Sequence, residues 1–158
     1  MDCRHIQFKS GHSMVDFAQV QTLLQKTAFW AQDRNLADLE TAIAYSDPVI
    51  TVWNHTQLIG FARATSDRVY RATIWDVLIH PDYQKCGLGR KLVETVLAHP
   101  HVNHVERVYL MTTYKQAFYK RIGFTENSTT TMVLHQNQPS HETLIQDLNP
   151  GVEQYVLL

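Results

Sequence analysis

The sequence lacks the features that mark membrane proteins, nucleic-acid-binding proteins and disulfide-rich secreted proteins. No apolar run approaches the length of a membrane span. The formal net charge is −1 and there is no block of basic residues, so neither a nucleic acid nor an anionic membrane is an expected partner. The two cysteines, Cys3 and Cys86, lie far apart in the sequence, which does not indicate a disulfide framework.

The N-terminus has neither the apolar core of a signal peptide nor a recognisable transit peptide. We therefore expect a cytoplasmic protein, located in the bacterial cytosol or the plastid stroma. Hydrophobic residues make up 44% of the chain and charged residues 18%, which is ordinary for a globular protein. A length of 158 residues suits one domain with a sizeable core.

Glycine is also scarce, with six residues, yet two of them are separated by one position in the run Gln84-Lys85-Cys86-Gly87-Leu88-Gly89-Arg90. An apolar, β-branched segment at 73–79 precedes this run and an amphipathic segment at 90–97 follows it, so a strand should lead through a turn into a helix. N–H groups at the start of a helix lack partners and lie at the positive end of its dipole. Because glycine lets an anion approach this backbone closely, a diphosphate is the expected ligand.

The spacing of the run narrows the choice of diphosphate. A Walker loop ends in Gly-Lys-Ser/Thr, whereas this chain continues Gly89-Arg90-Lys91. The dinucleotide fingerprint has three glycines near the first strand of a βαβ unit, and here two glycines lie past the middle of the chain. A plain helix cap remains the alternative.

A second segment, residues 117–124, reads Ala-Phe-Tyr-Lys-Arg-Ile-Gly-Phe and has the pattern of a helix end. Its apolar residues fall on one helical face, and Gly123 suits the left-handed position after a helix. Tyr119 can bury its ring there while its hydroxyl reaches a cleft. The alternative is a core tyrosine whose hydroxyl is hydrogen-bonded.

In this order, the glycine run and segment 117–124 resemble the two signatures of the GNAT acetyltransferases, Gln/Arg-x-x-Gly-x-Gly/Ala and Phe-Tyr-x-x-x-Gly-Phe. Residues 58–67 and 72–77 resemble the plastid and cyanobacterial branch of the family. That branch includes the plant serotonin (arylalkylamine) N-acetyltransferases and relatives that acetylate protein lysines and N-termini. The resemblance covers residues 30–124 and implies acetyl-CoA (coenzyme A) as cofactor.

Hydrophobic periodicity predicts a mixed α/β fold in the order β-αα-βββ-α-β-α-β. The expected elements are a strand at 3–8, a helix at 15–27, a helix capped by Asp33 and stopped by Pro48, strands at 49–53, 57–64 and 70–79, a helix at 88–97, a strand at 105–111, a helix at 114–122 and a strand at 130–135. The strand–helix–strand connection through 88–97 requires parallel pairing with a right-handed crossover. The resemblance implies a central mixed sheet in which the strands at 70–79 and 105–111 splay apart to admit the cofactor.

We expect residues 1–137 to form the acetyltransferase domain and residues 138–158 to form a C-terminal extension. The extension is too apolar for a solvated tail, so a short helix near 142–147 and a last extended segment are expected. It would pack on the domain or on another subunit, and the second arrangement would make a homodimer.

The resemblance implies a role for each residue of the site. Tyr119 matches the general acid that protonates the coenzyme A thiolate, Val77 the N–H donor to the thioester carbonyl, and Ile79 the residue that holds the pantetheine arm. The diphosphate would be held by the amides of residues 86–90. The implied cofactor-binding residues are Val77, Leu78, Ile79, Gln84, Lys85, Cys86, Gly87, Leu88, Gly89, Arg90, Thr112 and Phe118.

The general base is less clearly indicated than the acid. Many GNAT enzymes place Glu or His where this chain has Thr73, which cannot accept a proton at neutral pH. Asp76 is the nearest ionisable residue, and burial beside Trp75 and Val77 would raise its pKa. The alternatives are that Asp76 forms an ion pair, that His80, which we expect to be exposed, serves as a weaker candidate, or that water relays the proton.

The acceptor pocket and the histidines leave further choices open. Phe29, Trp30, Tyr45 and Trp53 could line an aromatic pocket, although Phe29 and Trp30 also fit a core. The family often has Asn or Asp where this chain has Thr112, so an anionic anchor for a cationic amine is missing. The histidines at 99, 101 and 104 show no fixed metal-ligand spacing on one element, so we interpret them as loop residues and expect no metal site.

Three functions are consistent with the sequence. The first is acetyl transfer from acetyl-CoA to a small arylalkylamine or a polyamine. The second is the same reaction on a protein lysine or N-terminus, which needs an open groove. The third is a non-catalytic module that binds acyl-CoA or a partner, which Thr73 and Thr112 favour and Tyr119 opposes.

Overall fold

The computed structural model describes residues 5–128 and 131–134. The chain divides into two units, 1–125 and 126–158, and each is described by itself. The predicted domain boundary after residue 137 falls in the second unit and outside the described residues. In that unit, residues 126–128 and 131–134 carry neither helix nor strand.

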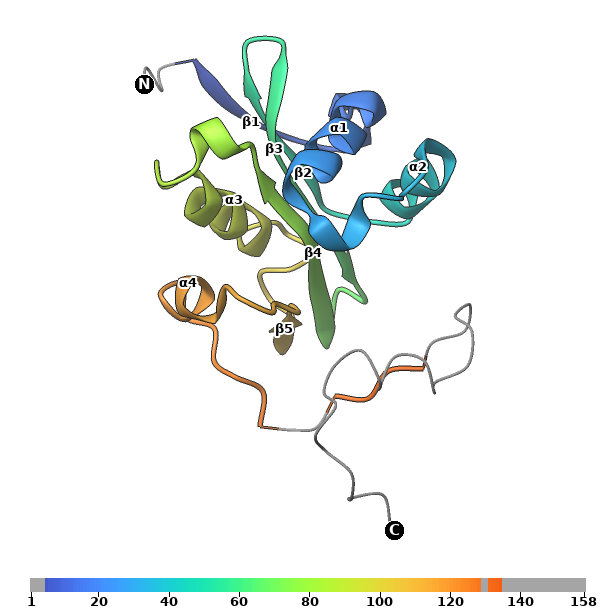
Figure 1. Ribbon diagram of the computed structural model, residues 1–158. Helices are drawn as coiled ribbons and strands as arrows, with labels where there is room; N and C mark the ends of the chain where they lie inside the picture. Colours follow the sequence, from blue (N-terminus) through green and yellow to red (C-terminus); the bar gives the residue numbers. More distant parts are fainter. Residues whose placement is uncertain (1–4, 129–130, 135–158) are drawn as a thin grey trace, which may run out of the picture. The chain divides into compact units, whose positions relative to one another are not determined.

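The first unit is built on a five-stranded sheet whose strands lie side by side in sequence order. The strands are β1 (Ile6–Ser10), β2 (Val49–Asn54), β3 (Gln57–Ser66), β4 (Arg71–Ile79) and β5 (Arg107–Tyr109). Strands β1 to β4 pair antiparallel and β5 pairs parallel with β4 (Figure 1). The parallel pair requires a crossover, which α3 (Leu88–Leu97) supplies. The predicted mixed α/β class with a central mixed sheet is confirmed.

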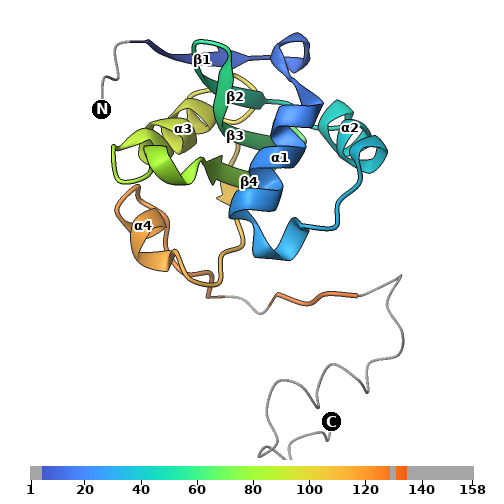
Figure 2. The ribbon, with the colours of Figure 1, turned by 45° about the horizontal axis from the view of Figure 1, so that its top comes forward.

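Helices cover both faces of this sheet (Figure 2). One face carries α1 (Phe17–Thr27) and α2 (Leu36–Ala44), and the other carries α3 and α4 (Gln116–Lys120). Both faces must therefore be apolar, and β2 shows how the alternation of a strand achieves this. Ile50 and Val52 pack in the core under α3, whereas Val49 and Trp53 pack in the core under α1 and α2.

Side-chain caps define the starts of α1 and α2. The Asp16 carboxylate accepts the N–H of Gln19 at 3.0 Å, and this bond lowers the pKa of Asp16. The Asn35 side chain accepts the N–H of Asp38 at 2.9 Å and begins α2. The prediction that Asp33 caps this helix is wrong, because Asn35 directly precedes its first residue.

The pairing between β4 and β5 is short. Three residue pairs join the two strands, from Arg71 opposite Arg107 to Thr73 opposite Tyr109. Because β5 ends at Tyr109, residues 74–79 of β4 have no β5 partner in the described chain. Here the two strands part, as the splayed arrangement predicts.

Other boundaries differ from the sequence prediction. Strand β5 occupies three residues instead of 105–111, because the backbone of Val105 closes a turn with Val102 and the chain leaves the sheet after Tyr109. Helix α4 begins at residue 116 instead of 114. Residues 131–134 form no strand, so the prediction of a last strand is wrong over them, and residues 130 and 135 lie outside the described chain. The predicted helix near 142–147 and the last extended segment also lie outside it.

None of the described helices has the length and hydropathy that a crossing of the bilayer requires.

Candidate active site

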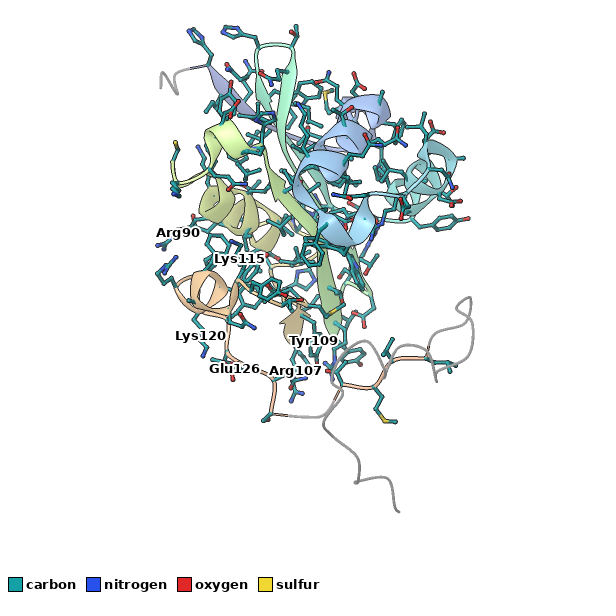
Figure 3. All side chains as sticks on the ribbon, viewed as in Figure 1. Arg90, Arg107, Tyr109, Lys115, Lys120 and Glu126 are labelled. Carbon is teal, nitrogen blue, oxygen red and sulfur yellow. The ribbon has the colours of Figure 1, made fainter. Side chains whose placement is uncertain are left out.

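A cavity of about 620 Å³ opens where β4 and β5 part. Its walls come from the connection between α1 and α2, from the second half of β4, and from the segment that leads from β5 into α4. The lining residues are Thr27, Phe29, Trp30, Arg34, Ile74, Trp75, Asp76, Val77, Leu78, Ile79, Gln84, Leu110, Met111, Thr112, Thr113, Tyr114, Lys115 and Tyr119. Figure 3 shows Lys115 on the segment between β5 and α4, and Tyr109 at β5.

Strand β4 carries a bulge on the wall of the cavity. Trp75 lies opposite Arg63 of β3 and Leu78 lies opposite Phe61, so two residues of β4 face a single residue of β3. Asp76, one of these two, has φ +52°, a left-handed conformation that is rare outside glycine. The bulge interrupts the ladder beside residue 77 and so frees backbone groups next to the cavity.

Two arginines hold the bulge through the carboxylate of Asp76. Arg34 Nη1 lies 2.9 Å from Asp76 Oδ1, and Arg63 Nε lies 2.7 Å from Asp76 Oδ2. The Asp76 side chain is 4% exposed. A buried carboxylate with both oxygens engaged by guanidinium groups is compensated as a charge, which fits the ion-pair alternative better than a free general base.

The arginine from β3 is itself fixed in place. Arg63 Nη1 donates to Ser46 Oγ at 3.0 Å, and its guanidinium carbon lies 5.8 Å from the centre of the Trp75 ring. The indole N–H of Trp75 donates to Thr65 Oγ1 at 2.9 Å. Asp76 is therefore part of a polar network that ties β4 to β3 and to the α2–β2 connection.

Tyr119 reaches the cavity from α4. Its ring packs edge-on against Phe118 and Phe124, with centroids 4.9 Å and 5.8 Å away. Burial raises the pKa of the Tyr119 hydroxyl above its ordinary value, because the phenolate loses solvation there. The hydroxyl therefore keeps its proton at neutral pH, and Tyr119 is one of the residues that line the cavity.

The glycine run forms the expected turn at the start of α3. Gly87 has φ +79° and precedes the helix, and its carbonyl accepts the first helical bond, from the N–H of Lys91 at 3.1 Å. The N–H groups of the three residues between them therefore have no acceptor within the helix. A Cβ at Gly89 would lie 3.5 Å from Phe118 Cζ, so the turn packs against α4. The geometry suits an anion at the helix start.

The predicted site residues fall into two neighbouring groups. The first lines the cavity: Tyr119, Asp76, Val77, Leu78, Ile79, Gln84 and Thr112. The second forms the turn, or packs against it, without lining the cavity: Lys85, Cys86, Gly87, Leu88, Gly89, Arg90 and Phe118. Gln84 connects the groups, because it lines the cavity and its side-chain amide donates to the carbonyl of Ile79 at 3.0 Å.

The charged residues of the turn, Lys85 and Arg90, are exposed. Arg90 projects outward from α3, and its Nε lies 2.7 Å from Glu94 Oε1 one turn along the helix (Figure 3). Lys85 has φ +65° and is exposed. His80 was expected to be exposed, but its side chain is 12% exposed because it packs beside Tyr83 at the end of β4.

The aromatic residues differ most from expectation. Phe29 and Trp30 are 64% and 57% exposed and line the cavity, so the core alternative for them is wrong. They lie in a short 3₁₀ turn after α1, and their rings pack against each other edge-on. The centre of the Tyr114 ring lies 6.2 Å from that of Phe29. Trp53 is instead a core residue, and Tyr45 is exposed away from the cavity lining.

Sequence reasoning missed Arg34, Arg63, Tyr114 and Lys115. Arg34 follows α1 and Arg63 lies in β3, and they meet only through Asp76 in the fold. No local pattern marks such a pair. Tyr114 and Lys115 precede the GNAT-like helix end, where the sequence predicted part of a helix.

Comparison with known proteins agrees with this geometry. Residues 17–124 match the acetyltransferase (GNAT) family. An uncharacterized N-acetyltransferase ycf52-like of Prochlorococcus marinus is 41% identical over 100 residues, which cover 61% of this chain and 54% of that protein. GCN5-related N-acetyltransferase 1, chloroplastic, of Arabidopsis thaliana is 34% identical over 94 residues, covering 58% of this chain and 48% of the relative. Histone acetyltransferase TAP1 of Glycine max is 34% identical over 131 residues, covering 75% and 55%.

The chain spans about half the length of these three relatives. Among solved structures, a putative acetyltransferase of the GNAT family from Xanthomonas campestris has a TM-score of 0.71 and 28% identity, covering 96% of this chain and 94% of that one. The cyanobacterial and chloroplastic relatives confirm the branch that the sequence resembles. Because the family match extends over more than half of its residues, this chain belongs to the GNAT family of acetyltransferases.

Proposed function

We propose that this protein transfers the acetyl group of acetyl-CoA to the nitrogen of a small aromatic primary amine. One observation carries the proposal: the cavity between the parted strands has protonated Tyr119 on one wall and the bulge of β4 on another, and it reaches the glycine turn through Gln84. A thioester held along β4 would have its sulfur near an acid and its carbonyl near backbone donors.

The residues of the chain fit coenzyme A in this position. The diphosphate would bind the N–H groups of residues 86–90, where the dipole of α3 favours an anion. The pantetheine arm would lie along Val77, Leu78 and Ile79, with Thr112 on the same cavity's wall. Phe118 would support the turn that holds the diphosphate, because it packs against Gly89. Lys85 and Gln84 would lie at the entrance.

The chemistry follows from these assignments. The amine nitrogen attacks the thioester carbonyl, and the N–H of Val77 would stabilise the charge that develops on the oxygen. When the carbon–sulfur bond breaks, the Tyr119 hydroxyl would donate its proton to the thiolate. The proton of the attacking amine would leave through water, because both oxygens of Asp76 are engaged by arginines.

The cavity wall supports an aromatic acceptor over a polyamine. Phe29, Trp30 and Tyr114 present exposed rings, whereas the one carboxylate among the described lining residues, Asp76, is neutralised by two guanidinium groups. A polyamine carries several positive charges that need free carboxylates, and the cation Lys115 on the wall would repel it more strongly than it repels an amine with a single charge.

A peptide acceptor is the second candidate, favoured by the similarity to histone acetyltransferase TAP1 of Glycine max. The chloroplastic relatives support the plastid stroma as a location, and cyanobacterial relatives support the bacterial cytosol.

Single-turnover release of coenzyme A thiol would test the proposal with arylalkylamines, polyamines and lysine peptides as acceptors. We expect release with arylalkylamines and a several-fold rise in KM for them in Trp30→Ala. Tyr45→Ala, which removes an exposed aromatic ring outside the lining, is the matched control. Acetyl-CoA binding without release on any acceptor would favour a non-catalytic module, and release on peptides alone would favour protein acetylation.

A further inference from the structure

Three side chains outside the cavity gather beyond the C-terminal end of α3. Asp47 lies between α2 and β2, and His99 and His101 follow α3. One ligand atom from each lies within 4.8 Å of the others, and none of the three lines the acetyl-transfer cavity. We propose that Asp47, His99 and His101 form a binding site for a divalent transition metal ion, with Zn²⁺ as the best match.

Two of the ligand atoms lie close enough together to share an ion. His101 Nδ1 lies 2.7 Å from Asp47 Oδ2. His101 Nδ1 is buried from solvent, and despite this short distance it has no hydrogen-bond partner within the described chain. Ligands of a tetrahedral zinc ion lie about 3.3 Å apart, since the bonds to nitrogen and oxygen are about 2.0–2.2 Å long. Small side-chain movements would therefore place all three groups around one ion.

The backbone that carries these ligands is already fixed. Ser66 Oγ donates to the carbonyl of His101 at 2.6 Å, and the N–H of Val102 donates to the carbonyl of His99 at 2.9 Å. Val102 is 1% exposed and anchors the loop in the core under α3. The N–H of Asp47 donates to a carbonyl of β3 at 2.8 Å. An ion would thus need to order side chains only, which lowers the entropic cost of binding.

The local electrostatics favour a cation from one side and oppose it from another. The carbonyl end of α3 lies next to His99 and attracts positive charge. Against this, Arg68 Nη2 lies 3.2 Å from Asp47 Oδ2 and competes for the same oxygen.

The ligand set decides which ion fits. Imidazole nitrogens suit Zn²⁺, Cu²⁺ and Ni²⁺, whereas Mg²⁺ and Ca²⁺ require six or more oxygen ligands. Two imidazoles and a carboxylate leave a fourth tetrahedral position, which water would fill. A bound ion would link the loop after α3 to the start of β2 and stabilise the folded chain.

Titration of the full chain, stripped with a chelator, would test the site with Zn²⁺ in a calorimeter and with Co²⁺ by visible absorption. We expect one ion per chain, a tetrahedral Co²⁺ spectrum, and a rise in Tm with Zn²⁺. In His101→Ala and in His101→Gln, the affinity for Zn²⁺ should fall by at least about tenfold. His104→Ala should leave it unchanged, because His104 contacts Asn103 and Arg68 instead of the cluster.

Arg68→Ala gives a sharper test, since removing the competing cation should tighten Zn²⁺ binding several-fold. Two results would overturn the proposal. One is an unchanged affinity for Zn²⁺ in both His101 variants, each having the same Tm without metal as the original chain. The other is loss of binding in His55→Ala, which would assign the ion to the separate pair of His5 and His55, whose rings lie 4.6 Å apart.

Discussion

At the scale of single residues, Tyr119 is the proposed proton donor, and it lines the cavity. Replacing it by Phe removes the hydroxyl and keeps the ring that packs on Phe118 and Phe124. We expect kcat for acetyl transfer to fall by about 10²–10⁴-fold, the usual contribution of a general acid, with the Kd of acetyl-CoA unchanged. Steady-state kinetics and calorimetry would measure the two. Tyr114→Phe, which removes another hydroxyl from the same cavity wall, is the control.

The pH dependence gives this prediction a second readout. Because burial raises the pKa of Tyr119, the hydroxyl keeps its proton when pH rises past the ordinary tyrosine value of about 10. The alkaline fall of kcat should therefore begin above that value. Stability should also fall with rising pH: the unfolded chain loses this proton first, so the free energy of unfolding decreases as pH rises above about 10. An alkaline limb unaltered in Tyr119→Phe would exclude Tyr119 as the acid.

The ion pairs of Asp76 make a contrasting prediction for the same site. Asp76→Asn leaves Arg63, a largely buried cation with a 12% exposed side chain, without its full counter-charge. Breaking such a pair should lower the free energy of unfolding by about 3–5 kcal/mol, measured by urea denaturation. As a positioning residue, Asp76 should affect kcat without removing the acid limb of the pH–rate profile. If that limb disappears while stability is kept, Asp76 is the base after all.

At the scale of elements, the turn before α3 combines a left-handed backbone position with the proposed diphosphate site. Gly87 has φ +79°, where an alanine is strained. Gly87→Ala should lower stability by about 1 kcal/mol and weaken acetyl-CoA binding several-fold, because the N–H groups that follow it shift. Urea denaturation and calorimetry would measure these effects. Gly89→Ala is the control, since its Cβ would meet Phe118 at 3.5 Å, an ordinary contact. Equal losses in both variants would contradict this explanation.

At the scale of the whole molecule, the proposed cofactor would join β4, α3 and α4 of the first unit. Acetyl-CoA at a concentration of 100 times its Kd should therefore stabilise the chain by about 2.7 kcal/mol and raise Tm by roughly 5–10 °C. Differential scanning calorimetry would measure the shift. Adenosine, which lacks the diphosphate and the thiol arm, should produce little shift. An equal shift with adenosine would mean that the turn does not hold the diphosphate.

The sequence makes one further prediction at this scale, with two alternatives. The C-terminal extension is expected to pack on the domain or to form a homodimer, and sedimentation would separate these arrangements. Its residues lie outside the described chain.

Much of the fold follows from local patterns that short-range physics enforces. Apolar alternation placed β2, β3 and β4 within a few residues of their bounds, and helical periodicity placed α3 at its bounds. The ends of β5 could not be predicted in this way. Residues 110 and 111 are apolar like a strand, but they leave the sheet and line the cavity. An apolar side chain has the same pattern in either place, so only the fold distinguishes them.

The sequence by itself determined the glycine turn, the place of Tyr119 near a helix end and the family, because each depends on residue spacing within short segments and on the order of those segments. The tertiary structure alone decided that Asp76 is paired, that Trp30 faces the cavity and that His99 lies beside Asp47. Each of these contacts is between residues of separate elements, as when Arg34 and Arg63 both pair with the carboxylate of Asp76. Charge compensation, burial and metal ligation depend on distances through space, and the order of residues does not specify them until the chain has folded.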